Sequence, residues 1–180
     1  SVGGVLFNKN ATELLRYPAG KTNSSYTIPN TVTTIEEYAF YGLRTLTDIN
    51  LPESINTIES YAFAYNTSLK QIYLFEHIKY IGEAAFRGTT NLHTLTLPFV
   101  GSEMNIDNNN TIDTYEMFGW IYGFEGNEES TNEEITDNAN YSIVSTLKTV
   151  VITADVIISP YAFSNADDIV SVTIPNTTTR

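Results

Sequence analysis

The sequence predicts a β-rich solenoid, in which short repeats stack to form a parallel sheet and return through short helical or 3-10 turns. Two observations lead to this prediction. An apolar hexapeptide recurs at a constant interval, since Phe40, Phe63 and Phe86 are equally spaced along the chain. A second apolar pattern, of the type found in strands, recurs between these copies. A period in the low twenties is typical of a solenoid, because one such unit cannot bury its apolar face alone.

The hexapeptide ends in Tyr-Ala-Phe or a close variant. Its copies are Ile35-Glu-Glu-Tyr-Ala-Phe40, Ile58-Glu-Ser-Tyr-Ala-Phe63, Ile81-Gly-Glu-Ala-Ala-Phe86 and Ile158-Ser-Pro-Tyr-Ala-Phe163. The segment is too short for a full helix, so we expect one helical or 3-10 turn per repeat. Large side chains at the end of each copy should fill the width of the solenoid. We therefore expect one continuous core that contains Phe40, Phe63, Phe86, Phe163, Leu51, Leu74 and Leu97.

The second pattern has strand periodicity. It reads Leu46-x-x-Ile49-x-Leu51, Leu69-x-x-Ile72-x-Leu74, Leu92-x-x-Leu95-x-Leu97, Leu147-x-x-Val150-x-Ile152 and Ile169-x-x-Val172-x-Ile174, after a partial copy at 26–29. A period of two places Ile49 and Leu51 on one face and Asn50 on the other. Threonine and β-branched residues, which strands prefer, are frequent here. Six such strands should stack into a parallel sheet, with rungs about 4.8 Å apart.

These units resemble the BspA-like leucine-rich repeats of bacterial surface proteins. The resemblance is carried by Ile28-Pro-Asn-Thr-Val-Thr-Thr-Ile-Glu-Glu-Tyr-Ala-Phe-Tyr-Gly-Leu-Arg-Thr-Leu46 and its later copies. The family's usual Gly-Cys is replaced throughout, for example by Gly42-Leu43 and Tyr65-Asn66. The resemblance implies a leucine-rich-repeat solenoid with its parallel sheet on the concave face. It also implies an N-terminal β-hairpin at 1–22, followed by the solenoid at 23–180.

An acidic insertion at 99–146 interrupts the repeats. Its charged residues are all Asp or Glu, with no Lys or Arg among them. Leu97 and Ile152 occupy successive equivalent positions of the strand pattern, but the interval between them is more than twice that between Leu74 and Leu97. Either the extra residues loop out, or the segment includes a degenerate repeat around the apolar stretches 112–115 and 117–124. The chain also stops in mid-repeat at Arg180, which we expect of a piece of a longer protein.

Composition excludes several classes of function. The chain has 180 residues, 42% of them hydrophobic, and a net charge of −12. This charge argues against nucleic acids and anionic membrane surfaces as partners. No apolar run reaches the roughly 18 residues of a membrane helix, so we expect no membrane insertion. Cysteine is absent, which excludes disulfides, thiolate catalysis and cysteine-based zinc sites.

The sequence offers no catalytic motif. It contains no H-E-x-x-H, G-x-S-x-G or Walker sequence. Asp107-x-Asn109-x-Thr111-x-Asp113 resembles the start of a calcium loop, but it lacks the required glycine and the closing glutamate. We interpret it as a polar turn, and His77 and His93 as structural or surface residues. We therefore expect no enzyme, no metal and no cofactor, although a carboxylate pair for glycoside hydrolysis always escapes detection in one sequence.

The remaining candidate site is the outward face of the long strands. We expect partner-binding residues at Asp48, Asn50, Gln71, Tyr73, Phe75, Thr94 and Thr96. Tyr73 is the expected anchor, because tyrosine offers a large contact area at low entropic cost. The resemblance implies a secreted or cell-surface protein that attaches to host extracellular or microbial surface proteins. The alternatives are a carbohydrate, small-ligand or hydrolytic site in the insertion around Trp120 and Tyr122, and a structural spacer.

Overall fold

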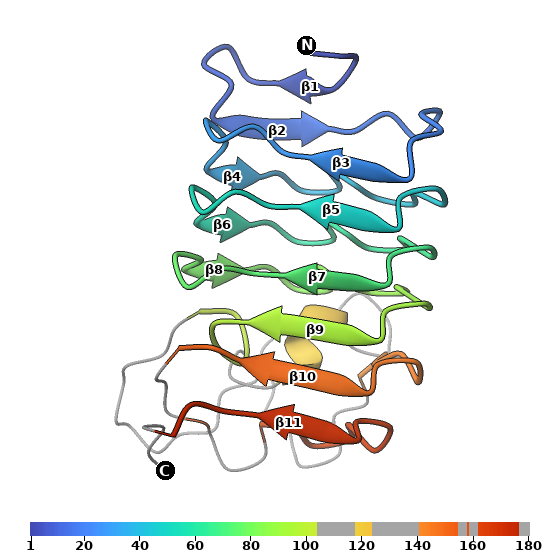
Figure 1. Ribbon diagram of the computed structural model, residues 1–180, viewed down its shortest axis with the longest axis vertical. Coiled ribbons are helices and arrows are strands. Elements are labelled where there is room, and N and C mark those ends of the chain that lie inside the picture. The colour runs from blue at the N-terminus through green and yellow to red at the C-terminus, as the bar shows by residue number, and fades with distance from the viewer. Residues whose placement is uncertain (104–117, 124–140, 155–157, 159–161, 177–180) are drawn as a thin grey trace, which may run out of the picture.

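The computed structural model describes residues 1–103, 118–123, 141–154, 158 and 162–176. Figure 1 shows the described residues as a nearly straight column of stacked coils, with the N-terminus at one end and the last strand, residues 171–173, at the other. The elements are β1 (Leu6–Phe7), β2 (Glu13–Arg16), β3 (Ser25–Thr27), β4 (Thr34–Ile35), β5 (Asp48–Asn50), β6 (Thr57–Ile58), β7 (Gln71–Tyr73), β8 (Tyr80–Ile81), β9 (Thr94–Leu97), the 3-10 helix η2 (Phe118–Tyr122), β10 (Thr149–Ile152) and β11 (Ser171–Thr173). The predicted solenoid is confirmed.

The six predicted strands are β3, β5, β7, β9, β10 and β11, and they follow one another down one side of the column (Figure 1). They pair in parallel and in repeat register, so that Gln71 lies opposite Thr94, and Thr94 opposite Thr149. The sheet is divided into β3–β5 and β7–β9–β10–β11. At the division the backbone N–H of Lys70 still donates to the carbonyl of Thr47 at 3.2 Å. We refer to the outward side of these strands as the long-strand face.

A second sheet, which we did not predict, lies on the leg that follows β3, β5 and β7. Its parallel strands β2, β4, β6 and β8 are short, and Ile35, Ile58 and Ile81 occupy equivalent buried positions in three of them. β1 pairs with β2 in antiparallel orientation, as expected of an N-terminal hairpin. The two sheets and the return leg thus give the coils that begin with β3, β5 and β7 three sides around one core.

The return leg corrects one expectation, because the Tyr-Ala-Phe segments form turns and not helical turns. Tyr38 and Tyr61 have φ angles of 57° and 56°, which lie in the left-handed region and interrupt a helix. Backbone donors alternate between two kinds of partner. The N–H of Ala39 donates within the turn, whereas the N–H of Phe40 donates to Ala62 of the next coil at 2.8 Å. Donors that a helix would use internally therefore join successive coils.

The phenylalanines form the centre of the core, as predicted for three of the four. Phe40, Phe63 and Phe86 are fully buried, and their rings stack at 5.2 and 5.4 Å between centroids. Leu51, Leu74 and Leu97 are buried beside them. Phe163 is only partly buried, which corrects our expectation. Its described ring contact is with Phe118 alone, at 5.1 Å, so it lacks the two-sided stacking of Phe63.

The described parts of the insertion, 99–103, 118–123 and 141–146, belong to a single coil. β9 pairs directly with β10, so no further rung lies between them. The carbonyl of Ser102 accepts from Ile81 on the second leg, at 2.6 Å. On the return leg, the carbonyl of Trp120 in η2 accepts from Ala84 at 2.9 Å. η2 therefore takes the place of a Tyr-Ala-Phe turn. The calcium-like segment at 107–113 and the Asn- and Glu-rich part after Gly126 lie outside the described residues.

Candidate functional site

The long-strand face is hollowed where β5, β7 and β9 lie side by side. The hollow has a volume of about 240 Å³ and is lined by Asp48, Ile49, Asn50, Gln71, Ile72, Tyr73, Thr94 and Thr96. Six of the seven binding residues predicted from the sequence are in this lining. The seventh, Phe75, lies just beyond β7. The structure thus brings together, from three coils, side chains that lie one or two whole repeats apart in the sequence.

Strand alternation explains this arrangement. Ile49, Ile72 and Leu95 are the central residues of their strands, and all three are buried in the core. Their neighbours on either side must then point outward. Because the coils stack in register, the outward residues form two rows along the column. One row contains Asp48, Gln71 and Thr94, and the other contains Asn50, Tyr73 and Thr96.

Tyr73 provides the exposed aromatic surface of the hollow. Its side chain is 50% exposed, although most large apolar residues of the strands are buried. The ring of Phe75 contacts it edge-on, at 4.8 Å between centroids and an interplanar angle of 69°. Phe75 is half-buried and stands where Pro52 and Pro98 follow the equivalent leucines in other coils. Phe75 therefore restricts the orientation of the Tyr73 ring.

Some polar side chains of the hollow form hydrogen bonds to other residues of the protein, and others do not. Asp48 accepts a hydrogen bond from the hydroxyl of Thr47 at 2.6 Å, and the amide of Asn50 donates to Thr27 at 3.3 Å. Within the described part of the chain, the side chains of Gln71, Thr94 and Thr96 form no hydrogen bond. Their donors and acceptors are therefore available to a ligand.

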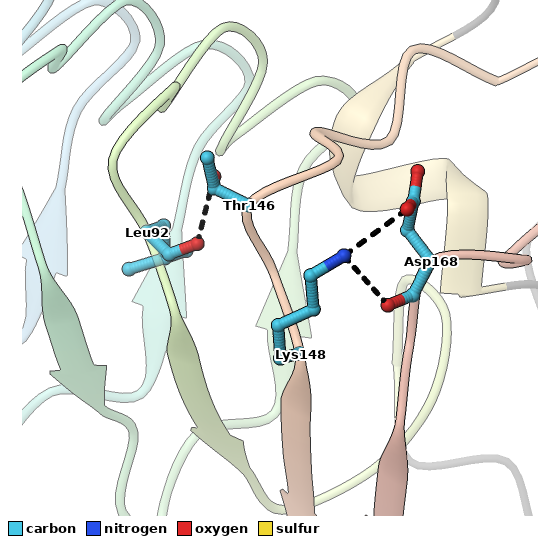
Figure 2. A network of polar contacts seen from close by, with 4 residues as sticks. All are labelled: Leu92, Thr146, Lys148 and Asp168. Atoms are coloured by element: carbon cyan, nitrogen blue, oxygen red, sulfur yellow. Dashed lines mark hydrogen bonds and ion pairs between the residues drawn. The ribbon is translucent and has the colours of Figure 1, made fainter.

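Basic residues lie at the turns that lead into the long strands. Lys70, His93 and Lys148 are repeat-equivalent and are joined by backbone hydrogen bonds of 3.0 and 3.1 Å. Figure 2 shows that the ammonium of Lys148 reaches Asp168 of the next coil, at 3.0 Å from its carboxylate and 3.1 Å from its carbonyl. Both side chains are largely exposed, so this ion pair contributes little to stability. None of these basic residues lines the hollow.

The second predicted site lies inside the protein. Trp120 is only 9% exposed and Tyr122 is fully buried, and both belong to the core. The indole N–H of Trp120 donates to the carbonyl of Ile81 at 2.9 Å. Burial raises the pKa of Tyr122. These two rings fill the irregular coil and are not presented on its surface.

A group of titratable side chains, the buried Tyr141 and the half-buried Glu83 and Arg87, lies beside η2. Burial raises the pKa of Glu83, and the nearby Arg87 partly opposes this shift. Burial, and to a lesser degree the charge of Glu83, raises the pKa of Tyr141 to about 12. The ring of Tyr141 lies directly on Gly119, where a Cβ atom would overlap it. This contact shows that Tyr141 packs as part of the coil.

An exposed tyrosine cluster on the return leg was missed by the sequence analysis. Tyr38 stacks on Tyr61 at 5.2 Å, Tyr41 contacts Tyr38 at 5.4 Å, and Tyr65 contacts Tyr41 at 5.3 Å. Tyr65 adopts a left-handed φ of 58° at a position where two other coils have glycine. The signal was present in the sequence, because tyrosine recurs at equivalent positions of the first two complete repeats.

Other kinds of site are absent from the described residues. No group of three or more His, Asp or Glu side chains there is placed to hold a metal ion. No helix in that part of the chain is long and apolar enough to cross a membrane. The expected absence of catalytic residues, metals and cofactors stays a prediction for the whole chain.

Solved structures with this fold come from bacterial proteins. A leucine-rich repeat protein from Eubacterium ventriosum is 25% identical, with a TM-score of 0.63, and the match covers 95% of this chain and 38% of that one. A leucine-rich cell surface protein from Faecalibacterium prausnitzii is 21% identical, with a TM-score of 0.61 and coverages of 91% and 35%. The pneumococcal vaccine antigen PcpA is 26% identical, with a TM-score of 0.53 and coverages of 99% and 40%. The chain spans less than half the length of each.

No curated protein matches the chain in sequence. The sequence profile of the BspA type leucine-rich repeat region, in contrast, matches residues 19–118 and 125–180, in six copies. The matched residues include every long strand from β3 to β11 and the buried phenylalanines of the return leg. The chain therefore belongs to the BspA-type leucine-rich repeat family.

Proposed function

We propose that the chain is a non-catalytic binding or adhesion module of a secreted or cell-surface protein, and that it binds its partner through the long-strand face. The observation that carries this proposal is the hollow across β5, β7 and β9. It combines an exposed, oriented ring at Tyr73 with polar groups at Gln71, Thr94 and Thr96 that form no hydrogen bond within the described residues. Oriented aromatic residues surrounded by adaptable polar groups are typical of binding surfaces.

The surrounding structure supports a rigid binding platform. β7 is hydrogen-bonded to β9, and β9 to β10, so the lining residues of these strands are held by an extended backbone ladder. The inward side chains Ile72 and Leu95 are packed in the core. A backbone held in this way needs little reordering when a partner binds, so the remaining ordering cost is that of the side chains.

The proposed partners are surface proteins of a host or of other microbes. The family, together with a similar solved structure described as a cell surface protein, supports a location where such partners would be met. A net charge of −12 disfavours nucleic acid as a partner. The buried rings of η2 give no support to a ligand site at Trp120 and Tyr122.

The test is a double variant, Tyr73→Ala with Gln71→Ala, assayed against immobilised extracellular-matrix proteins and intact cells. We expect at least a tenfold loss of affinity for the partner with unchanged thermal unfolding, which corresponds to about 1.4 kcal/mol of binding free energy. Tyr41→Ala is the matched control, since it removes an exposed tyrosine of the return leg and should leave binding unchanged. Equal affinity of the double variant and the unmodified protein would overturn the proposal.

A further inference from the structure

We infer that the hollow takes a sugar ring of a neutral glycan carried by the surface partner. This inference rests on the proposed function, because it names the ligand chemistry of the same site. The lining supplies one exposed phenol ring, two primary amides, one carboxylate and two hydroxyls, from Tyr73, Asn50 and Gln71, Asp48, and Thr94 and Thr96.

The polar groups of the hollow suit a polyhydroxylated ligand. Each sugar hydroxyl both donates and accepts hydrogen bonds, so a site needs both functions within a small area. Gln71 offers two N–H donors and a carbonyl, and Asn50 offers a carbonyl and the N–H that is not donated to Thr27. Asp48 offers acceptors, and Thr94 and Thr96 offer both functions. A planar amide or carboxylate can engage two adjacent hydroxyls of one sugar at the same time. The hollow thus has matching partners on both sides of Tyr73.

Tyr73 supplies the apolar part of the recognition. One face of a sugar ring carries C–H groups and packs well on an aromatic face. This packing is most favourable when the orientation of the aromatic ring is already restricted. The edge-on contact with Phe75, at 4.8 Å and 69°, restricts the orientation of the Tyr73 ring. Thr96 is the register partner of Tyr73 on the next rung, where paired strands are about 4.8 Å apart. Both residues line the same hollow, so one sugar in it can contact the ring and the hydroxyl.

A polypeptide fits the hollow less well than a sugar. Peptides that add to a sheet require an unpaired strand edge. β9 is hydrogen-bonded to a strand on both sides. β7 is the end strand of its sheet, but the preceding coil lies against it, and the backbone N–H of Lys70 donates to the carbonyl of Thr47 there. Stable protein interfaces also need a substantial apolar centre, whereas this lining has one exposed ring among polar groups. A hollow of about 240 Å³ is smaller than the sites of drug-sized ligands, which span roughly 300–1,000 Å³.

Charge restricts the glycan to neutral sugars. The carboxylate of Asp48 is the charged group in the lining, and Lys70 and His93 lie outside it. The whole chain carries a net charge of −12. Sialylated or sulfated sugars would therefore meet repulsion in the hollow as well as from the protein as a whole.

The test measures binding of the complete chain to arrayed glycans of three kinds, neutral, sialylated and sulfated. We expect binding to neutral glycans, with at least a tenfold loss in Tyr73→Ala and in Gln71→Ala with Asn50→Ala. Tyr73→Phe should retain binding to within about threefold, because the ring is kept; the factor corresponds to about 0.6 kcal/mol. Tyr41→Ala should bind as the unmodified protein does. Absence of neutral-glycan binding, binding that survives Tyr73→Ala, or a preference for acidic glycans would overturn the inference.

A second measurement separates this inference from the proposed function. A glycoprotein bound by the chain is assayed before and after enzymatic removal of its glycans. Loss of binding after deglycosylation supports the inference. Binding that persists after deglycosylation, and is weakened by Tyr73→Ala, overturns the glycan inference and leaves the proposed function standing. Binding that persists and is insensitive to Tyr73→Ala overturns both.

Discussion

Replacing Phe63 with alanine tests the repeat architecture most directly. Its ring is fully buried and lies between Phe40 and Phe86, with interplanar angles of only 15° and 4° to these neighbours. The backbone N–H of Phe63 donates to the carbonyl of Ala85 in the next coil at 2.9 Å. Because both ends of the ring stack are fixed by this ladder, neighbouring coils cannot close over the space that the ring leaves.

The expected cost can be estimated from this environment. A fully buried phenylalanine replaced by alanine costs about 3–5 kcal/mol, through lost transfer free energy and the cavity that remains. Each aromatic pair contributes roughly 0.5–1.5 kcal/mol beyond its buried area, and Phe63 loses two pairs, so we expect the upper part of that range. For a chain of this length, a loss of about 4 kcal/mol lowers the melting temperature by roughly 8–16 °C.

Thermal unfolding, followed by circular dichroism, measures this effect. Phe163→Ala is the matched control, since it removes the same side chain from the equivalent position of another coil. Phe163 is partly exposed and has one described ring contact, so its loss should cost only about 1–2 kcal/mol. If Phe63→Ala melted within a degree or two of the unmodified protein, or no lower than Phe163→Ala, the stacked core would be refuted.

Three further predictions concern single positions. A Cβ atom at Gly82 would overlap the backbone nitrogen of Ser60, so Gly82→Ala should lower the free energy of unfolding by about 2–3 kcal/mol in a urea titration. Asn66 is buried and its amide donates to two backbone carbonyls at 2.7 and 2.6 Å, so Asn66→Ala should cost about 1–3 kcal/mol; an unchanged urea midpoint would contradict this role. Tyr141 has its pKa raised to about 12 by burial and the charge of Glu83. An unfolded tyrosine ionises near pH 10, so stability should fall as the pH rises from about 10 to 12, and less steeply in Tyr141→Phe.

The outward residues of the long strands could be predicted from the sequence because repetition and alternation fix them together. Once Ile72 is placed in the core, Gln71 and Tyr73 must point outward, and the constant spacing places Thr94 beside Gln71. The hollow itself could not be predicted. It depends on the size and orientation of neighbouring side chains in three coils, including the contact between Tyr73 and Phe75.

The return leg shows where local sequence is insufficient. Tyr-Ala-Phe is compatible with a helical turn, but the donors that a helix would satisfy internally bond the next coil, and Tyr38 adopts a left-handed conformation. The tyrosine cluster on this leg follows from the same stacking, because Tyr38 and Tyr61 meet only when two coils are in register. The second sheet was missed for a related reason. Except for β2, the strands of this sheet are too short for an alternating pattern to be recognised.

The sequence by itself determined the solenoid, the repeat register and the inward residues, because each repeat restates the same pattern of apolar spacing. Only the tertiary structure decided that no further rung separates the strands on either side of the acidic insertion. β9 and β10 are joined by direct backbone pairing, although the interval from Leu97 to Ile152 is more than twice that of an ordinary repeat. The tertiary structure also placed Trp120 and Tyr122 in the core. The physical reason is that strand pairing and side-chain burial depend on contacts with segments that are distant in the sequence. Apolar periodicity indicates only which face of a single segment is buried.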